Sequence, residues 1–198
     1  ETHELKDELR NQLIVLGHHY QQDDVISFAD EKGDSLALAK KAVGISKPYI
    51  MFCGVHFMAE TADILTQGEK NVILPDLRAG CTMADMANIE QIEKSWEFMT
   101  SSTHEKITPI TYINCAATLK GFVGDHGGSI CTSSNAKKII SWAFEQGEKL
   151  LFFPDQHLGR NTCYEMGISL EDMVIYNPNM QDGGLTPEQI DKAKVILW

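Results

Sequence analysis

The chain has 198 residues, 43% of them hydrophobic and 23% charged, which suffices for a packed core in one or two domains. That composition excludes disordered, collagen-like and low-complexity proteins. Its 28 acidic and 17 basic residues give a net charge of −11, which disfavours nucleic acid and anionic membranes as partners. We also expect no membrane span, because no apolar run approaches the roughly 18–20 residues that a spanning helix needs.

Five cysteines without a Cys-x-x-Cys pair argue against a secreted disulfide framework and predict a cytoplasmic location. The charged helical pattern of residues 1–10 is unlike a secretion leader. Because the chain begins with Glu and stops on Trp198 just after the apolar run 195–197, we expect it to be a fragment of a longer protein.

Short apolar runs alternate along the chain with helical patterns. Buried strands are predicted at 13–16, 49–53, 72–74, 107–113, 150–153 and 173–176. Helices are predicted at 36–42, 57–66 and 82–92, and a further one begins at Asn135, with Gly147 where a left-handed C-cap belongs. One face of that helix carries Ala136, Ile139, Ile140, Ala143 and Phe144. This alternation predicts an α/β fold with mainly parallel sheets.

One ten-residue pattern occurs twice. Residues 67–76 and 146–155 both read Gln-Gly-Glu-Lys, then four mainly apolar positions, then Pro-Asp, with six identical positions 79 residues apart. Each copy follows a predicted helix and contains a predicted strand, so we expect repeated α/β units. A common type of helix C-terminus would also explain Gln-Gly-Glu-Lys by itself. We place domains at residues 1–95 and 96–190, and the start of a third, truncated domain at 191–198.

Polar side chains follow the first predicted strand. His18 and Tyr20 are two residues apart, so strand alternation puts them on one side and His19 on the other. A His and a Tyr in this position can form a proton-transfer pair. A hydrogen-bonded turn histidine beside a core tyrosine is the structural alternative.

Ser35 and Ser133 each stand before a predicted helix. Such serines commonly cap backbone amides, but a helix N-terminus also binds carboxylates and phosphates, which would suit a small anionic substrate. Tyr112 and Asn114 lie two residues apart at a strand end, and an Asn side chain can orient a carbonyl or an imine.

Cys81 follows Gly80 at the predicted start of the helix 82–92. A helix N-terminus favours the thiolate, which is the form that binds iron or attacks carbon. No two cysteines have metal-ligand spacing. We interpret the remaining four as structural: Cys53, Cys115, Cys131 and Cys163.

Several motifs together resemble the quinolinate synthase (NadA) family. In the first half they are Gly17-His18-His19-Tyr20-Gln21, Gly33-Asp34-Ser35-Leu36, Leu74-Pro75-Asp76 and Gly80-Cys81-Thr82-Met83-Ala84-Asp85. In the second half they are Thr111-Tyr112-Ile113-Asn114, Cys131-Thr132-Ser133-Ser134-Asn135-Ala136 and Phe153-Pro154-Asp155-Gln156-His157-Leu158-Gly159-Arg160-Asn161. The resemblance covers essentially the whole chain, in order.

The resemblance implies repeated three-layer αβα units, arranged with pseudo-threefold symmetry around a cavity that holds a [4Fe–4S] cluster. Two such units would be present here, and the third would be truncated. The implied activity of the complete chain is condensation of iminoaspartate (iminosuccinate) with dihydroxyacetone phosphate to quinolinate, phosphate and water, in de novo NAD biosynthesis. L-aspartate oxidase would be the upstream enzyme.

Matched motif by motif, Cys81 would be one cluster ligand, with two more expected beyond Trp198. The catalytic residues would be His18 and Tyr20. The substrate-binding residues would be His18, Ser35, Tyr112, Asn114 and Ser133. Two other functions remain open, namely a non-catalytic α/β module that binds a small anion, and an enzyme that uses Cys81 as a nucleophile.

Overall fold

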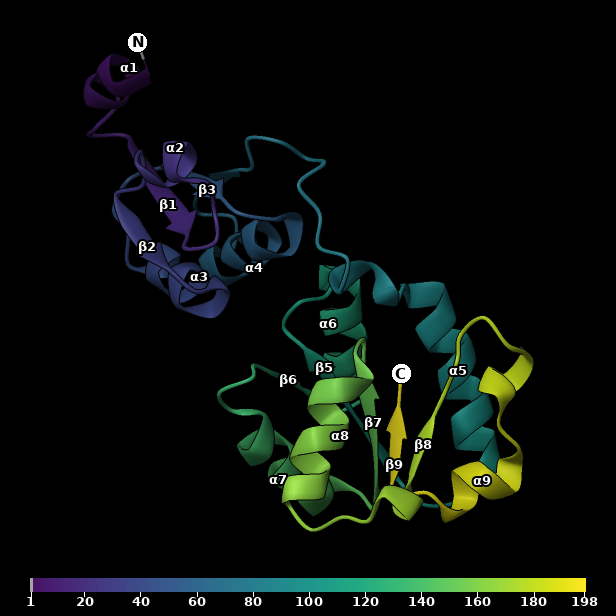
Figure 1. Cartoon of the computed structure of the whole chain (residues 1–198). Coiled ribbons are helices and arrows are strands. Elements are labelled where there is room, and N and C mark those ends of the chain that lie inside the picture. The colour runs from purple at the N-terminus through teal and green to yellow at the C-terminus, as the bar shows by residue number, and fades with distance from the viewer. Residues whose placement is uncertain (1) are drawn as a thin grey trace. The chain divides into compact units, whose positions relative to one another are not determined.

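The computed structural model describes residues 2–198 and divides into two compact units (Figure 1). The first unit ends at Cys81, and the second runs from Thr82 to Trp198. Each unit has its own parallel sheet, which confirms the expected α/β class. Among residues 2–198, no helix has both the length and the apolar sequence that crossing a bilayer requires.

The first unit is built on a four-stranded sheet with the order β2-β1-β3-β4, in which every neighbouring pair is parallel. Its strands are β1 (Leu13–His18), β2 (Glu31–Gly33), β3 (Tyr49–Cys53) and β4 (Asn71–Ile73). Its helices are α1 (Thr2–Glu8), α2 (Asp23–Ile26), α3 (Ser35–Val43) and α4 (His56–Thr66). Strands and helices therefore alternate here as the sequence predicts, and β3 has the predicted bounds.

Helices α3 and α4 pack against each other, and α3 also packs on β1 and β2. The buried face of α3 consists of Leu38, Ala39 and Ala42. Asp34 caps the helix by accepting a hydrogen bond from the backbone N–H of Ala37 at 2.8 Å. An apolar cavity of about 570 Å³ lies between α1, α2 and the strands, and its lining includes Leu5, Leu9, Val15, Phe28 and Met51.

The second unit is built on a five-stranded parallel sheet with the order β6-β5-β7-β9-β8. Its strands are β5 (Ile107–Tyr112), β6 (Ser129–Cys131), β7 (Lys149–Phe153), β8 (Met173–Ile175) and β9 (Val195–Leu197). Its helices are α5 (Ile89–Ser102), α6 (Ala117–Asp125), α7 (Ala136–Gln146), α8 (Gln156–Glu165) and α9 (Pro187–Lys192). Short 3-10 turns lie at Ala84–Met86, Leu170–Asp172 and Gln181–Gly184.

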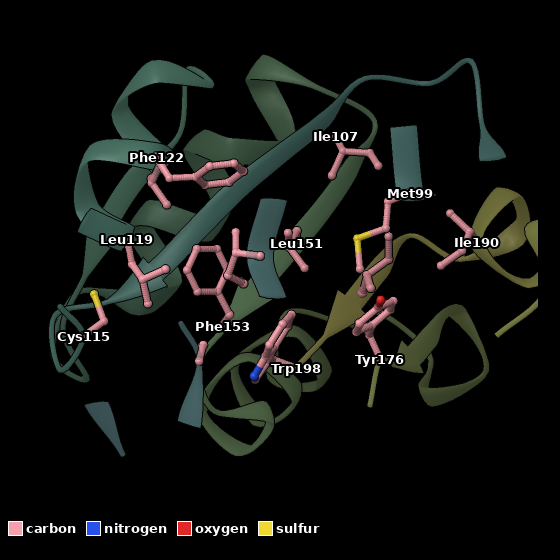
Figure 2. Close-up of a cluster of buried hydrophobic side chains, with 14 residues drawn as sticks. Met99, Ile107, Cys115, Leu119, Phe122, Leu151, Phe153, Tyr176, Ile190 and Trp198 are labelled. Carbon is pink, nitrogen blue, oxygen red and sulfur yellow. The ribbon is translucent and has the colours of Figure 1, made fainter. Parts of the chain in front are cut away.

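Helices cover both faces of the second sheet (Figure 1). On one face, α7 and α8 pack against the strands, where Ile140 and Cys163 contact a core that includes Phe152. The core on the other face contains residues of α5, α6 and α9, and Figure 2 shows its side chains. Here the ring of Tyr176 stacks on Trp198 with centroids 5.6 Å apart. This unit therefore has three layers, as the predicted αβα architecture requires.

The two sheets share part of their topology. In the first sheet β1 lies between β2 and β3, and in the second sheet β5 lies between β6 and β7. Helices α3 and α7 hold the same place in this order, and β3 and β7 begin 100 residues apart, at Tyr49 and Lys149. The ten-residue sequence repeat matches β4 with β7 instead, although these strands have different positions in their sheets. Its spacing of 79 residues is therefore not the period of the structural repeat.

Two boundaries differ from those placed on the sequence. The units divide between Cys81 and Thr82 rather than after residue 95, because α5 packs on α6 and α9 of the second unit. Residues 191–198, placed from the sequence at the start of a third domain, contain strand β9, which pairs with both β7 and β8. It lies between β7 and β8 in the second sheet.

The predicted helix at 82–92 is wrong over its first half. Residues 84–86 form a single 3-10 turn, and α5 begins only at Ile89, after a capping box made by Asn88 and Gln91. The left-handed C-cap predicted at Gly147 is also wrong, because its φ of −162° and ψ of 167° are extended. A Cβ at this position would lie 2.6 Å from the carbonyl oxygen of Lys106, so close packing accounts for the glycine.

Candidate functional site

Three aromatic rings are in contact at the carboxyl end of β1. His18 is the last residue of this strand and is 7% exposed, whereas Tyr20 is 83% exposed. The rings of His18 and His19 stack with centroids 4.6 Å apart, and the Tyr20 ring meets them edge-on at 4.9 and 4.4 Å. The prediction that His19 lies apart from the other two is wrong, because the strand ends at His18 and alternation does not continue into the turn.

The junction between β2 and α3 brings Ser35 to this strand end. Gly33, the last residue of β2, pairs with His18 in the register of the sheet. Asp34 is the N-cap of α3, so Ser35 is the first helical residue and does not cap the helix. Within residues 2–198 the Ser35 hydroxyl has no hydrogen-bond partner, which leaves it free to bind a ligand.

The second unit has a matching arrangement at the end of β5. Tyr112 is the last residue of this strand and pairs with Cys131, the last residue of β6. Asn114 follows in the loop and is half-buried. Ser133 is exposed at the start of the connection to α7.

Ser133 is also free of structural hydrogen bonds. The N-cap position of α7 is occupied by Asn135, whose side chain accepts a hydrogen bond from the backbone N–H of Thr132 at 2.7 Å. The hydroxyls of Thr132 and Ser134 are bonded to each other at 3.0 Å. In the part of the chain that the structure describes, the Ser133 hydroxyl has no such partner. The alternative that Ser35 and Ser133 serve as helix caps is therefore excluded for both.

These two groups stand at the same place in the shared topology. His18 and Tyr112 are the last residues of β1 and β5, which are the second strands of their sheets. Ser35 and Ser133 lie two residues beyond the ends of the neighbouring edge strands β2 and β6. We call them the first strand-end site (His18, Tyr20, Ser35) and the second strand-end site (Tyr112, Asn114, Ser133). The shared register makes His18 equivalent to Tyr112, Tyr20 to Asn114, and Ser35 to Ser133.

The electrostatics of the first strand-end site centre on His18. Burial lowers the pKa of this histidine, and the neighbouring His19 lowers it further, while the Asp34 carboxylate acts in the opposite direction. The net direction is downward, so the ring is neutral at neutral pH. Asp34 was not identified from the sequence as a site residue, although an Asp directly before a Ser and a helical run is a common N-cap signal.

Cys81 differs from the other four cysteines because it is partly exposed, whereas those four are buried. It ends the loop 74–81, in which the carbonyl of Ala79 accepts a hydrogen bond from the backbone N–H of His56 at 2.9 Å. No α-helix begins at Cys81, so the argument that a helix dipole favours its thiolate does not apply. Its exposure still makes it the thiol available to a metal or an electrophile.

The buried cysteines do not extend this site. Burial raises the pKa of Cys131 and of Cys163 to about 12 and also raises that of Cys53, so these thiols stay protonated. Cys115 is fully buried and accepts a hydrogen bond from the Thr111 hydroxyl at 3.2 Å. Among residues 2–198, no three His, Cys, Asp or Glu side chains are grouped as a metal site. Of the five cysteines, Cys81 is the one that could supply a ligand to an iron–sulfur cluster.

Comparison with known proteins identifies the family. The family model described as NadA, quinolinate synthetase A protein, matches residues 1–198. Curated quinolinate synthases from Streptomyces coelicolor and Corynebacterium glutamicum are 55% and 53% identical over 196 and 199 residues, which is 98% of this chain and 50% of each relative. The quinolinate synthase of Geobacillus kaustophilus is 53% identical over 195 residues, 98% of this chain and 53% of the relative. The chain spans about half the length of these relatives, and it belongs to the NadA family of quinolinate synthases.

Proposed function

We propose that the complete protein is a quinolinate synthase of the transferase class. It condenses iminoaspartate with dihydroxyacetone phosphate and releases quinolinate, phosphate and water in de novo NAD biosynthesis. L-aspartate oxidase is the upstream enzyme that provides the imine. The cytoplasm is the proposed location, which the five free cysteines support because thiols persist in a reducing compartment.

The observation that carries this proposal is the pair of equivalent strand-end sites, each of which has a serine hydroxyl without a hydrogen-bond partner among residues 2–198. Both substrates are anions that also carry a carbonyl or imine group. The free hydroxyls of Ser35 and Ser133 are suited to donate hydrogen bonds to carboxylate or phosphate oxygens. Asn114 is suited to orient a carbonyl or an imine, because its amide both donates and accepts.

We assign substrate binding to His18, Ser35, Tyr112, Asn114 and Ser133. We assign catalysis to His18 and Tyr20. The exposed phenol of Tyr20 is accessible to a substrate. In the second site Tyr112, the equivalent of His18, is half-buried. Condensation of an imine with a ketone requires protons to leave carbon and to reach departing oxygen, and positioned side chains accelerate such transfers.

The [4Fe–4S] cluster of the family fits this chain only in part. Cys81 would supply one thiolate ligand, since it is partly exposed and its loop is anchored at Ala79. We assign the remaining ligands to parts of the protein outside residues 2–198, because no three His, Cys, Asp or Glu side chains are grouped as a metal site within these residues. When bound, a cluster with an open iron position acts as a Lewis acid toward hydroxyl or carboxylate oxygens.

Anaerobic reconstitution of the complete protein with iron and sulfide tests this function. We expect a brown protein that forms quinolinate from iminoaspartate and dihydroxyacetone phosphate. A Cys81→Ser variant is expected to bind less iron and to lose quinolinate formation. The control is Cys163→Ala, which changes a buried thiol in the core of the second unit and should keep both properties.

Two results would contradict the proposal. A wild-type protein that takes up iron but forms no quinolinate would leave the anion-binding module as the better explanation. A colourless protein that is alkylated selectively at Cys81 would favour the cysteine-nucleophile enzyme.

A further inference from the structure

Within the described part of the chain, residues 2–198, the ring of His18 makes one hydrogen bond. Its Nδ1 atom accepts from the backbone N–H of Tyr20 at 3.4 Å, a long contact made by an amide two residues along the chain. A ring nitrogen that accepts a hydrogen bond carries no proton, and in a neutral imidazole the proton then resides on the other nitrogen. This contact therefore favours the tautomer of His18 in which Nε2 carries the proton.

The surroundings of the ring favour the same neutral state. His18 is buried, stacks on His19 at 4.6 Å and meets the Tyr20 ring at 4.9 Å. Burial and the charge of a protonated His19 both oppose a second proton on the ring, and the carboxylate of Asp34 offsets them in part. His19 and Asp34 are the charged groups that act on His18, and Tyr20 is the titratable group in ring contact with it.

No acceptor for the Nε2–H group lies among the residues that the structure describes. Within residues 2–198 the Tyr20 amide is the only hydrogen-bond partner of the His18 side chain. A polar hydrogen at the carboxyl end of β1 is therefore available to an acceptor atom of a ligand, such as a carboxylate, carbonyl or imine. A neutral donor stabilises charge that develops on this atom and does not need to give up its proton.

We propose that His18 acts as a neutral hydrogen-bond donor through Nε2, that the Tyr20 backbone amide holds it in this tautomer, and that His18 does not carry a proton in the reaction. The inference rests on the proposed function and gives His18 and Tyr20 different roles in catalysis. The phenol of Tyr20 moves protons, and His18 stabilises the acceptor atom of the substrate.

The state of the ring is measured on the chain itself by long-range ¹H–¹⁵N NMR correlation of its histidines, with His18→Gln used to assign the signals. Near neutral pH we expect His18 to show a protonated Nε2 and an unprotonated Nδ1. A ring protonated on Nδ1, or on both nitrogens, would overturn the proposal. This readout does not depend on whether the complete protein forms quinolinate.

Two pairs of variants test what determines the tautomer and the pKa of His18. Tyr20→Phe keeps the backbone N–H and should keep the tautomer, whereas Tyr20→Pro removes the N–H and should allow both tautomers. Asp34→Asn keeps a good N-cap for α3 but removes the charge, so the titration midpoint of His18 should fall. Asp63→Asn, on α4, is the matched control and should leave the midpoint unchanged. A single Nε2–H tautomer in a folded Tyr20→Pro variant, or an unmoved midpoint in Asp34→Asn, would contradict the assigned causes.

Activity of the complete enzyme tests the role. Gln places an amide N–H near the position of the histidine Nε2 but cannot carry a proton. We expect His18→Gln to keep quinolinate formation within about tenfold of the wild type, and His18→Leu to lose about 100-fold or more, as for removal of one preorganised donor. Equal losses in the two variants would show that His18 carries a proton. Absence of product in the wild type would instead contradict the proposed function.

Discussion

Gly147 and Gly127 are two positions that require glycine for different physical reasons. Gly147 has an extended backbone, but its Cβ would lie 2.6 Å from the Lys106 carbonyl oxygen. Gly127 has a φ of 70°, and nothing lies within 4 Å of its Cβ position. We predict that Gly147→Ala destabilises the chain by about 2–3 kcal/mol through overpacking, and Gly127→Ala by about 1 kcal/mol through backbone strain.

Urea denaturation measures the loss of stability in both alanine variants. Asparagine variants distinguish overpacking from backbone strain as its cause. Because Asn tolerates a left-handed backbone, Gly127→Asn should cost less than Gly127→Ala. At Gly147 the larger side chain should be at least as damaging as Ala. A well-tolerated Gly147→Asn would show that the packing explanation is wrong.

Asp30 and Lys6 form an ion pair in the first unit with an atomic separation of 2.7 Å. Burial of the carboxyl opposes its ionisation, but hydrogen bonds from Lys6 and from the Val15 backbone N–H outweigh this effect and lower the pKa of Asp30. A lowered folded-state pKa contributes stability above the unfolded value of about 4, and this contribution is lost as the pH falls through the folded value.

We therefore predict that Lys6→Met lowers stability at neutral pH by about 1 kcal/mol or less, since both side chains are partly exposed. The difference from the wild type should shrink toward about pH 3, where the carboxyl is protonated in both chains. The control is Lys41→Met, which removes a more exposed pair with Glu31 and should change stability by less than about 0.5 kcal/mol. A Lys6→Met deficit that is constant from neutral to acid pH would contradict the electrostatic explanation.

At the residue scale, the sequence predicted candidate site residues, and the structure shows how some of them lie relative to one another. The spacing of His18 and Tyr20 predicted a shared side correctly, because their rings are in contact. The same alternation failed for His19, because it applies only as far as the strand extends. The cap that Asp34 makes for α3 is a local contact that the sequence indicates, whereas its effect on His18 arises from tertiary proximity and was missed.

Lys149 joins three elements of the second unit. Its side chain is 2% exposed, and its Nζ donates hydrogen bonds to the carbonyls of Asp191 at 2.6 Å and Ala193 at 2.7 Å. The same atom lies 2.8 Å from Glu105 Oε2. The start of β7 is thereby connected to the C-terminal end of α9 and to the loop before β5.

We predict that Lys149→Met destabilises the chain by about 3 kcal/mol, because the apolar stem is kept but buried carbonyls lose their donor. Glu105→Gln should cost less than about 1 kcal/mol, because this carboxylate is half exposed. Denaturant titration of both variants checks the ranking. Equal costs for the two would mean that the ion pair, and not the carbonyl bonds, provides the stability.

At the element scale, the identity of strands and helices could be predicted from apolar patterns, whereas the end residues of several elements could not. Strand β3 was predicted from a short, continuous apolar run, and the helix after Asn135 from apolar residues that recur at helical spacing. The start of α5 was misplaced because apolar spacing continues upstream of the capping box at Asn88. That signal, Asn followed three residues later by Gln, was readable in the sequence.

At the scale of the whole molecule, the repeated architecture was predictable but its period was not. Alternating strands and helices indicate parallel α/β units, and the chain contains two. The 79-residue pattern misled because similar short sequences occupy strands at different sheet positions, β4 and β7. Likewise, strand β9 could not be assigned from its sequence, because its neighbours in the sheet are chosen by tertiary packing.

The proposed function requires that the serine hydroxyls of the two strand-end sites bind the substrates. Two neighbouring serines in the complete enzyme test it most directly, since Ser133 has a free hydroxyl while the Ser134 hydroxyl is bonded to Thr132. We predict that Ser133→Ala lowers kcat/KM for quinolinate formation about tenfold or more, as expected for loss of a hydrogen bond to a charged group. Ser134→Ala should stay within about twofold of the wild type. An unchanged kcat/KM in Ser133→Ala, or equal losses in the two variants, would contradict substrate binding by the Ser133 hydroxyl.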